Sequence, residues 1–258
     1  MASAVNVTGS ILSDQERGAG SSPSTALQSL RVQPIPFIAA KRLIVKYHYL
    51  QSMPGGTQLA FGVLLSGRLL GAITFGSGPA NAFRMVSGVK LDECLCLTRL
   101  WLSDELPANS ESRVIGISLR ALKKNTSIKF LVSYADPTEG HLGTIYQATN
   151  WLYTGYSESM PKFDMGDGVI RHSRSLSHAF GSHSLKHFES YGLNVKVVEQ
   201  PKKHRYIYLL DKSLRDRLNV PLLPYPRHTG EGSGTGSGNQ YNDSLPLCTP
   251  KYICIEEG

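Results

Sequence analysis

The chain has 258 residues, of which 41% are hydrophobic, and a formal net charge of +7. This hydrophobic content is sufficient for a buried core and excludes a chain that is disordered throughout. No apolar run reaches the roughly 18–20 residues that a membrane span requires, and the N-terminus lacks the basic and apolar regions of a secretory signal. We therefore expect a cytoplasmic protein without a membrane partner.

The positive charge is concentrated in one part of the chain. Residues 160–228 carry 12 basic and 6 acidic side chains and six of the eight His, whereas residues 229–258 have a net charge of −3. A charge this localised predicts a polyanionic partner, and a solvated basic surface is the alternative. The four Cys have neither disulfide-framework nor zinc-like spacing and are expected to be thiols in the core.

Both ends of the chain are expected to lie outside the folded domain. Residues 1–29 are rich in Ser, Gly, Ala and Thr without periodicity, which indicates a flexible leader. Residues 229–240 form a Gly/Ser linker, and residues 241–258 form a short C-terminal tail. One domain, residues 30–228, remains between them.

The hydrophobic pattern of this domain is mixed α and β. In chain order we expect a strand at 30–35, a helix at 39–50, a β-hairpin of 59–65 and 69–75 that turns at Ser66-Gly67, and a strand at 94–102. There follow a helix at 111–124, a strand at 128–135, a short helix at 142–151 and a strand at 152–155. A strand at 206–210 and a short helix at 211–218 end the domain. This order predicts an α/β fold with a mixed central β-sheet flanked by helices.

Two motifs indicate a class of enzyme. The run Arg113-x-x-Gly116-x-Ser118 lies where a helix opens after a strand, and free backbone N–H groups there can hold phosphates, although a packing Gly gives the same pattern. Tyr146 lies on a short helix that ends near Asn150, a residue type that readily adopts the left-handed conformation. In this order the two motifs resemble the GNAT acyltransferase superfamily. The resemblance implies that Tyr146 is the general acid for a departing thiolate.

The same resemblance implies a set of cofactor-binding residues, namely Arg113, Gly116, Ser118 and Ser133. It also implies that two neighbouring parallel strands, at 94–102 and 128–135, splay apart to admit the acyl donor. Arg99 interrupts the first strand, and an unpaired guanidinium in a buried strand is costly. Arg99 therefore requires a carboxylate or a bound anion, and Asp136 is its expected partner.

Several segments together are similar to the Mom-like DNA modification enzymes of bacteriophages, a divergent GNAT branch. The matching segments are His48-Tyr49-Leu50, Leu97-Thr98-Arg99-Leu100, Asn109-Ser110-Glu111-Ser112-Arg113, Ser133-Tyr134-Ala135-Asp136-Pro137 and the long run 139–151. The resemblance covers about residues 35–210 and implies conversion of adenine in double-stranded DNA to N6-carbamoylmethyl adenine, which protects phage DNA from host restriction. By motif position it implies a catalytic set of Arg99, Ser112, Asp136 and Tyr146, joined by His48 and Tyr49.

The basic region is then expected to hold the DNA. The candidate phosphate contacts are Arg171, Arg174, Lys186, Lys202, Lys203 and Arg205. Tyr191, Tyr206 and Tyr208 are candidates for stacking on a base. The target adenine is either modified in the major groove or swung out of the duplex, as base-modifying enzymes more often do.

The cofactor and the exact reaction stay open at this point. Ser118 departs from the Gly or Ala that usually ends a GNAT phosphate loop, and acetyl transfer would not deliver a carbamoylmethyl group, so the donor is unknown and an acetyl-CoA-like molecule is one option. His48, Tyr49 and Asp136 are ligand types that suit iron, which makes iron a candidate cofactor. The other two hypotheses are an acetyl-CoA-dependent N-acyltransferase acting on a protein or small amine, and a non-enzymatic DNA-binding protein on a GNAT scaffold. The oligomeric state is also open, with a homodimer as one option.

Overall fold

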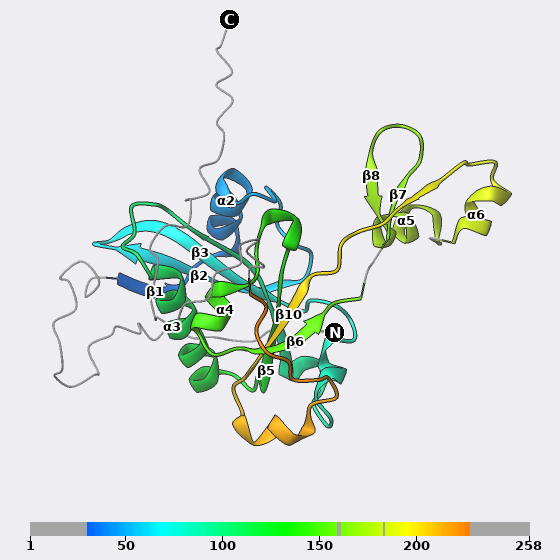
Figure 1. The fold of residues 1–258 in the computed structure, drawn as a ribbon. Helices are drawn as coiled ribbons and strands as arrows, with labels where there is room; N and C mark the ends of the chain where they lie inside the picture. Colours follow the sequence, from blue (N-terminus) through cyan, green and yellow to red (C-terminus); the bar gives the residue numbers. More distant parts are fainter. Residues whose placement is uncertain (1–29, 159–160, 183, 228–258) are drawn as a thin grey trace, which may run out of the picture. The chain divides into compact units, whose positions relative to one another are not determined.

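A computed structural model describes residues 30–158, 161–182 and 184–227, and Figure 1 shows its ribbon. The predicted leader, linker and tail lie outside these residues, as do Cys248 and Cys254. Within the described part of the chain, none of the helices has the length and apolar character needed to cross a membrane.

The main sheet has seven strands in the order β1-β2-β3-β4-β5-β10-β6. Their bounds are β1 Leu30–Pro34, β2 Thr57–Leu65, β3 Arg68–Gly76, β4 Cys94–Leu102, β5 Phe130–Ala135, β6 Leu152–Tyr156 and β10 His204–Leu209. Five of the neighbouring pairs are antiparallel, and β4 with β5 is parallel. The predicted α/β class with a mixed central sheet is therefore confirmed.

The predicted hairpin is present and turns where expected. Ser66 and Gly67 join β2 to β3 with φ angles of +50° and +83°. Positive φ at both central residues is the type I′ geometry, whose twist matches that of the flanking strands.

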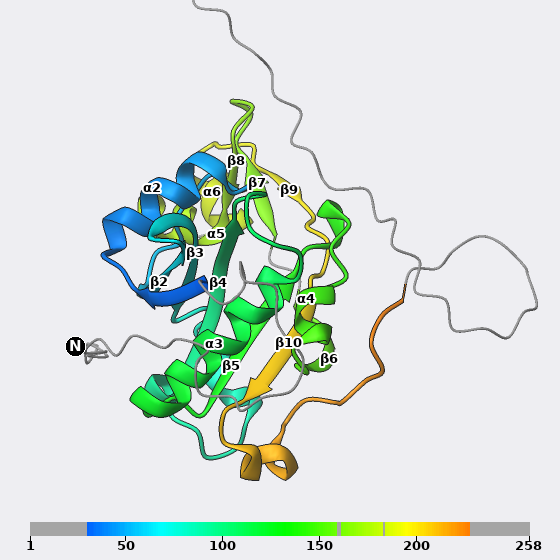
Figure 2. The same ribbon diagram turned by 90° about the vertical axis from the view of Figure 1, so that its left-hand side faces the viewer.

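One face of the sheet is covered by α3 (Ser110–Asn125) and the short α4 (Thr144–Ala148), and Figure 2 shows α3 lying across the strands. Val114, Ile117 and Leu122 of α3 recur at helical spacing and are buried in this layer. Alternation along β4 sends Leu95 toward α3, while its neighbour Cys96 belongs to the core on the other face.

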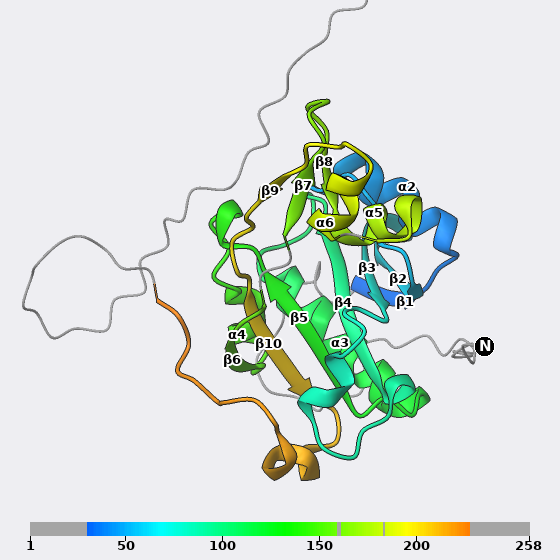
Figure 3. The same cartoon turned by 90° about the vertical axis from the view of Figure 1, so that its right-hand side faces the viewer.

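The opposite face, seen in Figure 3, is covered by α2 (Phe37–Tyr47) and by short 3₁₀ segments at Ala82–Met85 and Lys212–Arg217. Ala40 and Ile44 of α2 pack against Ala72 of β3. We predicted a helix at 39–50, but α2 ends three residues earlier because His48 adopts an extended backbone, with φ −76° and ψ 140°. The early end places His48 and Tyr49 in a loop.

Between β6 and β10 the chain forms a small unit of its own that the sequence analysis did not assign. It comprises β7 (Lys162–Asp164), β8 (Ile170–His172), α5 (Ser173–Phe180), α6 (Leu185–Ser190) and β9 (Lys196–Val198), with strand order β8-β7-β9. Phe163, Leu176 and Phe188 form its core. Its strands have three residues each, which is too short for an alternating pattern to stand out. We call residues 161–198 the insertion.

Candidate active site

The site begins where β4 and β5 separate. The two strands pair at three positions, Cys94 with Phe130, Leu95 with Leu131 and Cys96 with Val132, and the pairing then ends. Beyond this point β4 continues to pair with β3, and β5 continues to pair with β10. The strands therefore diverge, and the predicted splay is confirmed.

Ser133 and Tyr146 lie at the point of divergence. Ser133 Oγ is 3.0 Å from the carbonyl oxygen of Leu97 on β4 and 2.8 Å from the hydroxyl of Tyr146. The Ser133 hydroxyl is the donor toward both oxygens, and its single proton is shared between them. The predicted role of Ser133 in cofactor binding stays a prediction; in this structure its buried hydroxyl contacts these two partners and orients the phenol.

Tyr146 is held on a helix whose ends are set by special backbone conformations. α4 starts after Gly143 at φ +79°, and the chain leaves it through Asn150 at φ +60°, the left-handed conformation predicted for that Asn. The Tyr146 ring packs 5.1 Å from Trp151 and 5.2 Å from Tyr206. Burial raises the pKa of Tyr146 well above its usual range, so the phenol stays protonated at neutral pH and can donate a proton.

Arg99 and Asp136 lie near this split but have different partners from those expected. Arg99 donates from Nε to the Ser52 carbonyl at 3.0 Å and from Nη1 to the Thr98 carbonyl at 2.7 Å. Asp136 forms an ion pair with Lys203 instead, with 2.6 Å between Oδ2 and Nζ. The predicted Arg99–Asp136 pair is therefore wrong, because β10 brings Lys203 to the end of β5 and the loop after α2 satisfies the guanidinium.

The Asp136 carboxylate is fixed and ionised. Its Oδ1 accepts hydrogen bonds from the backbone N–H and the hydroxyl of Thr138, at 3.1 and 2.6 Å. Burial raises the pKa of Asp136, but the hydrogen bonds from Lys203 and Thr138 outweigh burial and lower the pKa below its usual value. The anion therefore persists at neutral pH.

His48, Tyr49 and His141 form an aromatic cluster beside these charges. The rings of His48 and Tyr49 stack at 4.4 Å, and His141 approaches Tyr49 edge-on at 5.7 Å. Burial, followed by the charges of Arg99 and His141, lowers the pKa of His48 to about 4, so its imidazole is neutral. Burial and the Asp136 charge raise the pKa of Tyr49.

These residues do not fit an iron site in this arrangement. The Nδ1 of His48 accepts a hydrogen bond from the Leu50 N–H at 3.1 Å, so in the neutral ring Nε2 carries the proton and neither nitrogen has a free lone pair. The carboxylate of Asp136 is bound to Lys203 and Thr138. Across the described ranges, no group of three His, Cys, Asp or Glu is placed to hold a metal ion.

Of the predicted phosphate-binding residues of α3, Ser118 lies apart from the others. Ser112 lies in the first turn, where its Oγ donates to the Asn109 carbonyl at 3.0 Å. Arg113 and Gly116 are half-buried, and Ser118 lies fully buried on the core side of the helix. Ser118 is thus placed among core side chains rather than at a phosphate, and its cofactor role stays a prediction that the structure does not favour.

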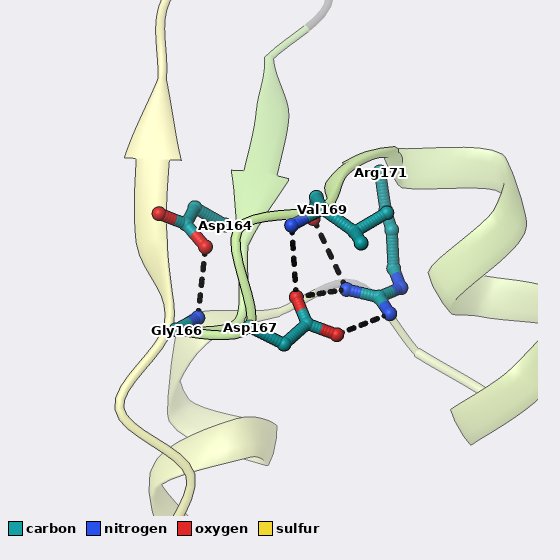
Figure 4. A network of polar contacts seen from close by, with 5 residues as sticks. All are labelled: Asp164, Gly166, Asp167, Val169 and Arg171. Carbon is teal, nitrogen blue, oxygen red and sulfur yellow. Dashed lines mark hydrogen bonds and ion pairs between the residues drawn. The ribbon is translucent and has the colours of Figure 1, made fainter.

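The predicted DNA-binding residues differ in how they are placed. Arg171 is clamped by Asp167, with 2.8 Å from Nη1 to Oδ1 and 2.5 Å from Nη2 to Oδ2, as Figure 4 shows. Arg205 donates to the Thr154 hydroxyl and carbonyl, both at 2.9 Å. These two guanidinium groups, like Lys203, are thus partly neutralised or satisfied within the chain.

The remaining candidates for DNA contact are exposed or undescribed. Lys186 and Lys202 are exposed, and the side chain of Arg174 lies outside the description. Of the candidate stacking residues, Tyr191 is exposed and Tyr208 is partly buried. Tyr206 is fully buried and donates to the Leu142 carbonyl, so the prediction that it stacks on a base is wrong.

Sequence reasoning missed three participants. These are Ser52, which receives Arg99, His141, which touches Tyr49, and Lys203 in its role as partner of Asp136. Each acts through a contact with a distant segment, and no local spacing signals such a contact. His141 alone lay inside a segment that the resemblance had singled out.

The strand order, with a parallel pair that diverges beside a buried tyrosine, defines a GNAT-like fold. A family model described as the Mom protein family matches residues 29–227, and the chain belongs to this family. The chain is also 30% identical, over 212 residues, to the methylcarbamoylase mom of Escherichia phage Mu, a match that covers 78% of this chain and 85% of the phage protein.

Solved structures of acetyltransferases are similar in outline only. A probable GNAT-family acetyltransferase from Chromobacterium violaceum is 11% identical with a TM-score of 0.41, and the match covers 80% of this chain and 96% of that one. The spermidine/spermine N-acetyltransferase SpeG from Vibrio cholerae is 10% identical with a TM-score of 0.42, over 73% of this chain and 96% of that one. The fold assignment rests on the strand order and the splay described above.

Proposed function

We propose that this enzyme modifies DNA by transferring a carbamoylmethyl group to N6 of adenine in double-stranded DNA, and that the modification protects phage DNA from host restriction. Membership of the Mom family and 30% identity to a protein named methylcarbamoylase support the type of group transferred. The observation that carries the proposal is the buried, protonated Tyr146 at the split, with the anionic Asp136 and the cationic Arg99 nearby.

The bond changes of the proposed reaction assign a task to each group. The lone pair of N6 forms a bond to the methylene carbon of an activated carbamoylmethyl donor, and the bond from that carbon to the leaving atom breaks. The leaving atom takes up a proton from Tyr146, while N6 loses one proton to Asp136 or to water. Because the amino group of adenine is a weak nucleophile, close positioning of the two reactants contributes more than deprotonation does.

Arg99 has the role of orienting the amide of the transferred group. Two of its nitrogens are anchored on backbone carbonyls, at Ser52 and Thr98, so the planar guanidinium is held in a fixed orientation. An amide oxygen is a suitable acceptor for a remaining N–H of this group. The donor itself is left open, and no step is assigned to iron, because the residues present do not fit an iron site.

Mass spectrometry of host DNA tests the proposal. The protein is expressed in a bacterial host, the DNA is digested to nucleosides, and we expect a deoxyadenosine carrying one carbamoylmethyl group. Tyr146→Phe should abolish this product while DNA binding persists. As a control, Tyr47→Phe removes the hydroxyl of a tyrosine whose ring stacks on Trp101, and it should leave the product unchanged. Unmodified DNA from the wild-type culture would overturn the proposal, and an acetylated amine in its place would favour an acyltransferase.

A further inference from the structure

Tyr49 presents one open aromatic face at the site. His48 stacks on the other face of its ring, with 4.4 Å between centroids and 26° between planes. The residue is nevertheless 49% exposed. A ring that is covered on one side and half exposed leaves aromatic surface to solvent, on which a planar ligand can lie.

The support behind this ring is rigid. His48 is buried and its Nδ1 is bound to the Leu50 N–H, so the imidazole cannot turn without breaking a hydrogen bond inside the protein. His141 contacts the edge of the Tyr49 ring at 75°. The phenol is therefore preorganised as a flat platform, and a planar ligand would lose little free energy in ordering it.

Two backbone contacts tie the platform to the groups assigned to chemistry. The His141 N–H donates to the Asp136 carbonyl at 3.2 Å, which links the edge of the platform to the proposed proton acceptor. Arg99 Nε donates to the Ser52 carbonyl, three residues after Tyr49. The charges of Asp136 and Arg99 both act on the Tyr49 hydroxyl, so a planar group lying on Tyr49 would have a carboxylate and a guanidinium near it.

We propose that the open face of Tyr49 is the stacking site for the target adenine after this base has swung out of the duplex. The inference rests on the proposed function and adds to it the residue that receives the base. Enzymes that modify a base commonly extrude it and hold it against aromatic side chains, and such stacking needs only the ring of the tyrosine. The predicted candidate Tyr206 cannot do this because it is fully buried.

Tyr47 provides a matched control two residues away. It is 45% exposed and also stacks on one face, against Trp101 at 4.6 Å and 14°. Its ring partner belongs to β4 rather than to the loop of Asp136. Tyr47→Leu and Tyr49→Leu therefore remove equivalent rings from the same end of α2, and only the second removes the proposed platform.

The test combines product analysis with a fluorescent base. Wild type, Tyr49→Leu, Tyr49→Phe and Tyr47→Leu are compared for modified deoxyadenosine in host DNA. The same proteins are bound to a duplex with 2-aminopurine in a mismatched pair, which is easily extruded. We expect Tyr49→Leu to lose about tenfold or more of the product and to bind the duplex with brighter 2-aminopurine, because the extruded base is no longer quenched by stacking. Tyr49→Phe should restore most of the product and the quenching, and Tyr47→Leu should match the wild type.

Three results would overturn the inference. Tyr49→Phe as defective as Tyr49→Leu would show that the hydroxyl matters rather than the ring. Equal loss in Tyr47→Leu would indicate general damage to the end of α2. Wild-type product and quenching in Tyr49→Leu would exclude stacking while leaving the proposed function intact. If instead the wild type modifies no DNA, the proposed function fails, and the 2-aminopurine signal still decides whether Tyr49 stacks on an extruded base.

Discussion

Replacing Ser133 with Ala should destabilise the protein more than replacing Tyr146 with Phe, although each change removes one hydroxyl. Ser133 sits between two buried groups, the Leu97 carbonyl and the Tyr146 hydroxyl. Ser133→Ala leaves the Tyr146 hydroxyl without its partner and leaves the Leu97 carbonyl with only the weaker hydrogen bond from Cys96 Sγ, whereas Tyr146→Phe leaves Ser133 bound to Leu97. The asymmetry arises because Ser133 is bonded to both groups, so only its removal breaks both contacts.

The magnitudes follow from the cost of a buried, unsatisfied polar group. That cost is about 1–3 kcal/mol for the Tyr146 hydroxyl, and the lost hydrogen bond to the Leu97 carbonyl adds about 1 kcal/mol, so Ser133→Ala should lower the free energy of unfolding by about 2–4 kcal/mol. Tyr146→Phe loses one net hydrogen bond and should cost about 1 kcal/mol. In the double variant the orphaned phenol is absent, so its cost should fall short of the sum of the single variants by about 1–2 kcal/mol.

Urea unfolding of the four proteins measures this coupling. Ser110 provides the control, because it is a buried serine whose Oγ donates at 2.6 Å to the Pro107 carbonyl and is not bonded to Tyr146. Ser110→Ala combined with Tyr146→Phe should be additive. If Ser133→Ala and Tyr146→Phe are also additive within about 0.5 kcal/mol, the hydrogen bond between them does not exist and the argument for an oriented phenol fails.

Three further predictions concern the surroundings of the site. Lys203→Met removes the ion pair with the Asp136 carboxylate, which is 13% exposed, and should lower the free energy of unfolding by about 1–2 kcal/mol and abolish most of the DNA modification. Lys202→Met should only weaken salt-sensitive DNA binding. Equal losses of modification in both variants would refute the idea that Lys203 positions Asp136. The pKa of His48 is lowered to about 4 in the folded protein, whereas an unfolded histidine titrates near about 6.5. As the pH falls from about 6.5 to about 4, the unfolded state therefore binds a proton that the folded state does not, and up to about 3 kcal/mol of the free energy of unfolding should be lost. Unfolding free energies of the wild type and His48→Gln measure this, and parallel pH curves would contradict it. Gly143 and Gly140 have φ angles of +79° and +70°, but only at Gly143 would an added Cβ meet a buried ring, that of Tyr206. Gly143→Ala should therefore lower the free energy of unfolding by about 3 kcal/mol or more, and Gly140→Ala by about 1 kcal/mol, as thermal unfolding can measure.

Much of the fold could be predicted because its signals are local. The Ser66-Gly67 turn follows from the conformations that the turn residues adopt, and the left-handed Asn150 follows from its place after a short helix. The end of α2 was missed by three residues, since the helical spacing of Leu43, Ile44 and Tyr47 does not show where the helix stops, and the backbone turns extended at His48. The insertion carries no alternation long enough to be recognised.

In the candidate site, too, the sequence predicted what depends on local signals and missed what depends on contacts between distant segments. The sequence by itself determined which residue types are present and which family the motifs resemble, and that resemblance implied a splayed pair of strands before Tyr146. Only the tertiary structure decided the partners, with Asp136 bound to Lys203, Arg99 bound to Ser52 and Ser133 turned toward the phenol. The physical reason is that β10 lies between β5 and β6 in the sheet, so it brings a distant lysine to the end of β5, and no spacing along the chain records such an encounter.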